Sequence, residues 1–118
     1  MNLKTNPIPH QNLLFICSRN KRRSLSAEMI WKNDQEFTVK SCGTSPSSRV
    51  KVNEKLLNWA DIIFVMEKRH KEILSQKYAT IITSKNVHVL HIKDVYELMD
   101  EKLVQLLKER VGAAFCQT

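Results

Sequence analysis

The sequence predicts a three-layer α/β/α fold, in which helices cover both faces of a four-stranded parallel sheet. Residues 13–16 and 61–66 contain continuous apolar runs, which are typical of strands buried on both faces. Segments with helical spacing alternate with the strand segments, and this alternation favours parallel strands joined by crossover helices. The length of 118 residues suits one domain with one core.

The first half of the chain contributes a helix, a strand and a loop after the strand at 13–16. Residues 24–32 have helical spacing, with Leu25 and Met29 on one face. Residues 36–40 alternate between apolar and polar side chains, which predicts a second strand. The run Ser-Pro-Ser-Ser at residues 45–48 then predicts a loop.

The alternation continues in the second half of the chain. A helix is predicted over residues 52–60, directly before the apolar strand at 61–66. Residues 67–77 form a basic amphipathic helix, and residues 86–92 alternate in part, which predicts a fourth strand.

The last predicted helix begins after Asp100, which can cap its N-terminus. Leu103, Leu107 and Val111 recur at the spacing of one helical face. Gly112 follows the last of them, and a glycine at that place predicts the end of the helix.

The N-terminal residues 1–11 are expected to form an extended tail, because they carry two prolines and no apolar segment of the secretion-signal type. The single domain is then expected over residues 12–118. A cytoplasmic location is the default expectation for such a chain.

The cysteine and histidine residues do not predict a disulfide or metal site. Cys17, Cys42 and Cys116 are odd in number and widely spaced, which argues against a disulfide framework and against a zinc site. His88 and His91 would point to opposite faces of a strand.

The segment richest in chemistry follows the first strand. Cys17 and Arg23 have the spacing C-x5-R, and Ser24 comes next where a helix begins. A loop that curls into a helix N-terminus points its backbone N–H groups inward and forms an anion nest. Such a nest favours a cysteine thiolate, which is a nucleophile at neutral pH. The fork of Arg23 matches two phosphoryl oxygens, and Ser24 can donate a hydrogen bond to the sulfur.

Two other interpretations of this segment stay open. Cys17 can be an ordinary buried thiol at a strand end. The basic run RNKRR can bind nucleic acid, since 19 Lys and Arg against 12 Asp and Glu give a net charge of +7 and predict an anionic partner. However, residues 18–24 contain no aromatic side chain on which a base would stack. The phosphate site is therefore the favoured interpretation, and nucleic acid is an unlikely partner.

Four short motifs follow one another along the chain. The loop reads CSRNKRRSL from Cys17 and is followed by Ala-Glu; SCGTS from Ser41, DIIFVME from Asp61 and DVY from Asp94 come later. In this order they resemble the C-x-G-N-x-x-R-S-P, S-A-G-T-S, D-x-I-x-x-M-[DE] and D-P-Y motifs of the low-molecular-weight protein tyrosine phosphatases. The resemblance covers roughly residues 12–112 and implies a flavodoxin-like fold with a phosphate-binding loop after the first strand.

The resemblance implies catalytic roles for three residues. Cys17 would be the nucleophile, Arg23 would clamp the phosphate, and Asp94 would protonate the leaving oxygen. No metal or cofactor is implied. The phosphate-binding loop would consist of Ser18, Arg19, Asn20, Lys21, Arg22, Arg23 and Ser24.

It also implies supporting roles for residues around the loop. Ser24 would stabilise the thiolate, Asn20 would brace the loop with Ser41 as its partner, and Tyr96 would line the entrance of the pocket.

The chain departs from the family pattern at several positions. Arg19 stands where the family has a loop glycine, which puts the shape of the loop in question. Arg22 replaces a second loop cysteine that can protect the nucleophile through a reversible disulfide. Val95 replaces the proline of D-P-Y, which makes the loop that carries the acid less rigid.

The function implied is that of a cysteine-dependent phosphomonoester hydrolase, most simply a protein tyrosine phosphatase that works through a phosphocysteine. Its partners would be a phosphorylated protein or a small aryl phosphate, with inorganic phosphate or sulfate able to occupy the loop, and no membrane. Two alternatives remain: a thiol-dependent arsenate reductase, which needs further cysteines, and a non-catalytic module that binds phosphorylated partners.

Overall fold

The computed structural model describes residues 10–116 of the chain. Most of the expected tail, residues 1–9, lies outside the described residues, as do residues 117–118 of the expected domain. The first strand begins at Gln11.

The four strands form one parallel sheet in the order β2-β1-β3-β4. Its strands are β1 (Gln11–Cys17), β2 (Phe37–Gly43), β3 (Ile62–Val65) and β4 (Asn86–Val89). From β1 the chain first passes to β2 on one side and then crosses to β3 on the other. The order therefore reverses at β1, and the carboxyl end of β1 is the place where open sheets of this kind bind ligands.

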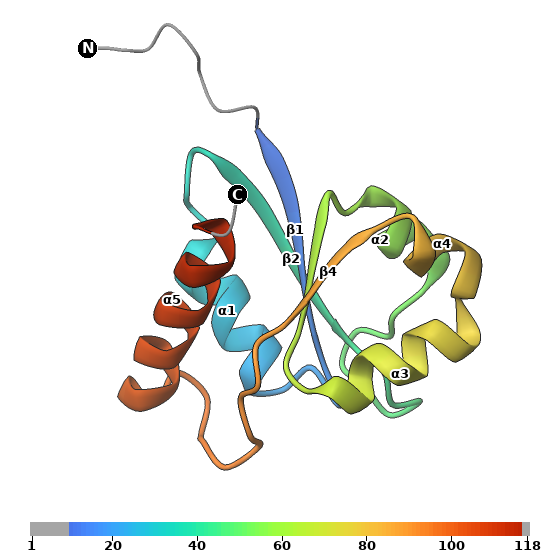
Figure 1. Ribbon diagram of the computed structural model, residues 1–118. Coiled ribbons are helices and arrows are strands. Elements are labelled where there is room, and N and C mark those ends of the chain that lie inside the picture. The colour runs from blue at the N-terminus through green and yellow to red at the C-terminus, as the bar shows by residue number, and fades with distance from the viewer. Residues whose placement is uncertain (1–9, 117–118) are drawn as a thin grey trace, which may run out of the picture.

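Helices cover both faces of the sheet, which confirms the predicted three-layer α/β/α fold (Figure 1). One face carries α1 (Arg23–Trp31) and α5 (Glu101–Phe115). The other carries α2 (Glu54–Trp59), α3 (Lys68–Lys77) and α4 (Ala79–Thr83). Within residues 10–116, no helix has both the length and the hydropathy needed to cross a bilayer.

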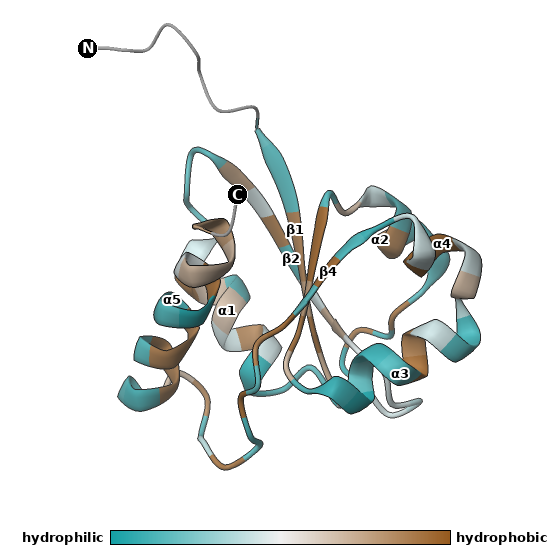
Figure 2. Ribbon diagram, viewed as in Figure 1, coloured by the Kyte–Doolittle hydropathy of each residue, from teal (hydrophilic) through white to brown (hydrophobic). Residues whose placement is uncertain are grey.

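The central strand β1 contributes side chains to both layers of the core. Leu13, Phe15 and Cys17 pack towards α1 and α5, whereas Leu14 and Ile16 pack towards α2 and α3. All five are buried, and burying an apolar side chain of this size stabilises the fold by about 1.5–3 kcal/mol. The inner strands are accordingly apolar along most of their length in Figure 2.

The structure differs from the sequence prediction at the end of the last helix, at the end of the fourth strand and between α3 and β4. The last helix continues through Gly112 to Phe115, because the ring of Phe115 stacks on Phe37 at 5.4 Å and extends the apolar interface. The fourth strand ends at Val89, and His91 has a positive φ of 57°, so it lies beyond the strand. The short helix α4 was not predicted at all; a break at Tyr78 separates it from α3.

Candidate active site

In the loop between β1 and α1, Asn20 is the residue with a positive φ. Asn20 has a φ of 60°, a left-handed conformation that asparagine tolerates better than most residues. Arg19, which stands where the family has glycine, is not among the residues with positive φ in the described part of the chain. The backbone at Arg19 therefore does not require the positive φ that glycine would allow.

The sulfur of Cys17 lies on the floor of this loop and receives polar contacts from two directions. The backbone N–H of Asn20 donates to the sulfur at 3.3 Å, and the hydroxyl oxygen of Ser24 lies 2.9 Å from it. Cys17 is only 3% exposed, yet it lines the cavity described below. Both contacts can direct a hydrogen-bond donor at the sulfur.

A chain of hydrogen bonds from Glu28 to Ser24 determines whether the Ser24 hydroxyl donates or accepts in each contact. Ser41 donates its hydroxyl hydrogen to the carboxylate of Glu28 at 2.5 Å, so its oxygen accepts from the amide of Asn20 at 2.8 Å. The same amide donates to the Ser24 oxygen at 2.8 Å. Ser24 already accepts there, so its own hydrogen can go to the Cys17 sulfur at 2.9 Å or to the carbonyl oxygen of Cys42 at 3.4 Å, and the contact with the sulfur is the shorter one.

The segment after β2 holds the loop from the outside. The Ser48 hydroxyl can donate to the carbonyl oxygen of Ser18, at 2.9 Å, or to that of Ser45, at 2.7 Å. The backbone N–H of Arg49 donates to the carbonyl oxygen of Arg19 at 3.0 Å. A Cβ atom on Gly43 would lie 2.6 Å from the Ser18 oxygen. Glycine is required at this position because the two backbones approach so closely.

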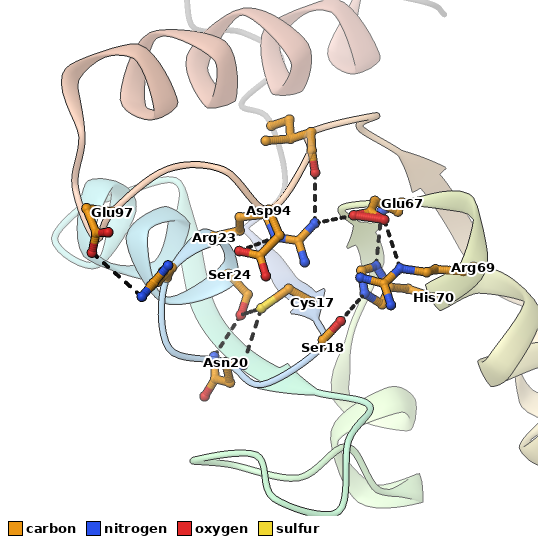
Figure 3. Close-up of polar contacts among 12 residues, drawn as sticks. Cys17, Ser18, Asn20, Arg23, Ser24, Glu67, Arg69, His70, Asp94 and Glu97 are labelled. Carbon is orange, nitrogen blue, oxygen red and sulfur yellow. Dashed lines mark hydrogen bonds and ion pairs between the residues drawn. The ribbon is translucent and has the colours of Figure 1, made fainter.

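Arg23 begins helix α1 and is held almost fully buried, at 2% exposure. One terminal nitrogen donates to the carboxylate of Glu67 at 2.6 Å and to the carbonyl oxygen of Ile92 at 2.8 Å. Its Nε lies 3.8 Å from the carboxylate of Asp94 (Figure 3). These contacts orient the guanidinium towards the loop, where it can donate hydrogen bonds to phosphoryl oxygens.

Glu67 joins Arg23 to a second arginine. Its other carboxylate oxygen accepts from the Nε of Arg69 at 2.8 Å. The hydrogen bonds from Arg69 and then Arg23 lower the pKa of Glu67 to about 2. The carboxylate therefore stays charged at neutral pH and partly neutralises two cations.

His70 lies beneath the loop as a neutral imidazole. Its Nδ1 accepts from the backbone N–H of Glu67 at 3.1 Å, which leaves the proton on Nε2, and Nε2 then donates to the hydroxyl of Ser18 at 2.9 Å. Burial, followed by the charges of Arg23 and Arg69, lowers the pKa of His70 to about 4.

A cavity of about 390 Å³ opens above the loop. Asp94, half exposed on the segment after β4, faces it from the side opposite the loop. The lining consists of Cys17, Ser18, Arg19, Lys21, Arg22, Arg23, Arg69 and Asp94.

Four of the expected site residues do not line this cavity: Asn20, Ser24, Ser41 and Tyr96. Asn20 and Ser24 are fully buried beneath it and act through hydrogen bonds. Tyr96 packs against the core on the α1 and α5 side and lines a separate hollow with Met99 and Asp100. The segment is drawn to α1 by the backbone N–H of Met99, which donates to Ser26 at 2.9 Å.

The sequence did not place Glu67, Arg69 and His70 at the site: the basic segment Lys68, Arg69, His70 and Lys71 could be interpreted as a recruiting surface for acidic substrates, but a solvated helix face was the favoured interpretation. They follow β3, and β3 pairs directly with β1, so the ends of the two strands lie side by side. Strand order is not visible in the sequence. The available signals were their position at the carboxyl end of an apolar strand and, for Glu67, the last place in the DIIFVME motif.

Comparison of the sequence with models of protein families finds no match, and comparison with curated proteins finds none either. The structure, in contrast, is similar to solved phosphatase structures. A low molecular weight protein tyrosine phosphatase, SP-PTP from Streptococcus pyogenes, superposes with a TM-score of 0.74 at 16% identity, over 91% of this chain and 92% of that chain.

Two other solved structures give the same result. Wzb from Vibrio vulnificus, in complex with benzylphosphonate, has a TM-score of 0.71 at 21% identity, over 92% of this chain and 99% of that chain. The YwlE arginine phosphatase from Geobacillus stearothermophilus has a TM-score of 0.66 at 16% identity, over 89% and 92%. At these identities the likeness establishes the fold, which is the one that the sequence motifs imply.

Proposed function

We propose that the chain is a cysteine-dependent phosphomonoester hydrolase that acts on phosphotyrosine or another aryl phosphate. The observation that carries the proposal is the environment of Cys17, a sulfur at the base of a cationic cavity with a hydroxyl hydrogen directed at it. The solved structures of similar fold include an enzyme described as a protein tyrosine phosphatase and one described as an arginine phosphatase, which supports the same chemistry.

The first step transfers the phosphoryl group to sulfur. The loop N–H groups and Arg23 hold the phosphoryl oxygens, and the Cys17 thiolate attacks phosphorus. As the S–P bond forms, the bond from phosphorus to the ester oxygen breaks. Asp94 gives its proton to that oxygen, which leaves as a phenol.

The second step removes the phosphoryl group from sulfur. Asp94, now a carboxylate, takes a proton from a water molecule as the water oxygen attacks phosphorus. The S–P bond breaks, and the electron pair returns to the Cys17 sulfur, where Ser24 stabilises it. Inorganic phosphate leaves, and Asp94 is protonated for the next cycle.

The structure gives physical reasons to place the alternatives second. An arsenate reductase needs further cysteines near the nucleophile, but Cys42 packs on the opposite face of the sheet from Cys17. Burial, with a smaller contribution from the nearby Cys17, raises the pKa of Cys42 to about 12, so it stays a thiol. Cys116 is exposed at the end of α5. A non-catalytic binder would need neither the nucleophile nor Asp94.

A phosphorylated protein is the partner that this site suits, with inorganic phosphate or sulfate as competing anions. The described cysteines are free thiols, and a reducing compartment such as the cytoplasm keeps a catalytic thiol active.

Hydrolysis of p-nitrophenyl phosphate tests the proposal. Wild type is expected to turn over and Cys17→Ser to be inactive, whereas Cys42→Ser, which removes the other buried thiol, should stay active. Equal activity of wild type and Cys17→Ser would exclude the proposed nucleophile.

A further inference from the structure

We infer that the site selects substrates with a second anionic group beside the phosphoryl group, and that Arg69 binds this second group. The substrate class is an acidic phosphopeptide. The inference rests on the proposed function, because it specifies the substrate of the same cavity.

Arg69 is oriented but not saturated by its contacts. Its Nε donates to Glu67, and within residues 10–116 its terminal nitrogens make no hydrogen bond. The side chain is 55% exposed and lines the cavity together with Cys17 and Ser18. The free side of the guanidinium is a planar fork suited to a carboxylate.

The position of Arg69 fits a second anion and not the phosphoryl group itself. Arg23 and Arg69 bind the two oxygens of one carboxylate, that of Glu67, so one carboxylate group separates them. Arg23 already serves the nest around Cys17. An anion at Arg69 would therefore lie next to the bound phosphoryl group, on the side of Ser18 and His70 (Figure 3).

The cations around Arg69 suit an extended acidic segment. Lys68 and Lys71 are exposed on the same helix, α3, and the first turn of this helix contains basic residues and no acidic one. Cations in a first turn interact unfavourably with the helix dipole, so they do not serve the stability of α3. A single phosphate would need only the nest, whereas an acidic peptide could use the further cations.

The composition of the cavity points the same way. Its lining contains five cationic side chains, one carboxylate and no aromatic ring. Discrimination between substrates would therefore come from charge more than from stacking on an aryl group.

Two phosphotyrosine peptides test the inference, one with glutamates on both sides of the phosphotyrosine and one with glutamines in their place. Kinetics are measured for wild type, Arg69→Gln and Lys108→Gln. Lys108 is exposed on α5, away from the site, so its substitution removes the same charge and controls for the general field of the protein.

Wild type should have a higher kcat/KM for the glutamate peptide. Arg69→Gln should lower the glutamate-to-glutamine ratio by about three- to tenfold, mainly through KM, because one exposed charged pair is lost. Lys108→Gln should leave the ratio unchanged.

The inference is overturned if wild type treats the two peptides alike, if Arg69→Gln slows both equally, or if Lys108→Gln lowers the ratio as much. If Arg69→Gln slows both peptides equally, Arg69 acts only through its contact with Glu67. If Lys108→Gln lowers the ratio as much, the effect comes from the overall charge of the protein. Failure of the proposed function looks different, since neither peptide nor p-nitrophenyl phosphate would be hydrolysed. The ratio of the two peptides' binding affinities, measured by fluorescence anisotropy, then gives the same test.

Discussion

The helices that meet at the cavity begin differently from two that lie away from it. Helices α2 and α5 begin after Asn53 and Asp100, whose side chains accept hydrogen bonds from the first turn, and each has a glutamate in that turn. Helices α1 and α3 have no acidic residue in the first turn and begin with Arg23 and with Lys68 and Arg69. The first pair follows the rules of helix stability. The second pair departs from them in the charge of the first turn, although Glu67 and His70 form a capping box at the start of α3.

This difference indicates that the starts of α1 and α3 are less favourable for helix stability and more favourable for binding an anion. Each cation in a first turn costs about 0.3–1 kcal/mol against the helix dipole. At α1 and α3 the same cations create the positive field that an anionic substrate needs. Glu67 offsets part of the repulsion between them, because its carboxylate is shared by Arg23 and Arg69.

The largest effect is expected at Asp94. Asp94→Asn should slow hydrolysis of phenyl phosphate by about 10²–10⁴-fold, because the leaving oxygen loses its proton donor. The loss should be smaller for p-nitrophenyl phosphate, whose leaving group is more acidic. The kcat/KM values for the two esters, which report the transfer to sulfur and not the later hydrolysis of the intermediate, check this; equal losses in kcat/KM would contradict the acid role.

Arg23→Lys should come next, with a loss of about 10²–10³-fold in kcat/KM. The charge is kept, but an ammonium cannot contact two phosphoryl oxygens at once or keep the contacts to Glu67 and Ile92. Inhibition by inorganic phosphate should weaken in parallel. Unchanged phosphate inhibition would show that Arg23 does not hold the anion.

His70 should make the protein less stable in acid. Its pKa of about 4 in the folded protein lies below the ordinary value of 6.5, so the unfolded chain binds the proton first as the pH falls. Stability should therefore drop by about 2 kcal/mol between about pH 7 and about pH 5. Glu67 changes the stability only below this window. Its pKa is lowered from 4.5 to about 2 in the folded protein, so the stability that it provides at neutral pH is lost as the pH falls through these values.

Urea unfolding at the two pH values measures the His70 effect. His70→Gln should remove most of the dependence, whereas His91→Gln, at an exposed histidine, should retain it. The same slope in all three proteins would assign the acid sensitivity elsewhere.

The smallest effect is expected from removing the N-cap of α5. The Asp100 carboxylate accepts a hydrogen bond from the backbone N–H of Lys102 at 2.8 Å. Asp100→Ala removes this cap of α5 and should lower the free energy of unfolding by about 1 kcal/mol. Activity per folded molecule should not change. If Asp100→Ala slows the reaction more than Asp94→Asn does, the acid has been assigned to the wrong aspartate.

Much of the fold was predictable because its signals are local. The apolar runs of β1 and β3 and the alternation of strands and helices are properties of neighbouring residues. The end of α5 was missed because the contact of Phe115 with Phe37, which lie far apart in sequence, outweighs the usual effect of Gly112.

The site also has one part that was predictable from local sequence and one part that depends on contacts between distant segments. Residues 17–24 form a contiguous motif, and Asp94 was visible through its resemblance to D-P-Y. Glu67, Arg69 and His70 reach the site only because β3 pairs with β1, which the sequence does not show. The place of Tyr96 depends on how the segment before α5 folds onto α1, a tertiary contact with no local signature.

The central claim is that Cys17 carries the phosphoryl group during turnover. Asp94→Asn, mixed with p-nitrophenyl phosphate, should still phosphorylate the sulfur because the leaving group is good, but should hydrolyse the intermediate slowly. Rapid acid quench followed by mass spectrometry of the Cys17 peptide measures this directly. We predict the added mass of one phosphoryl group on Cys17; nitrophenol release by this variant without that modification, or with it on another residue, would contradict the account.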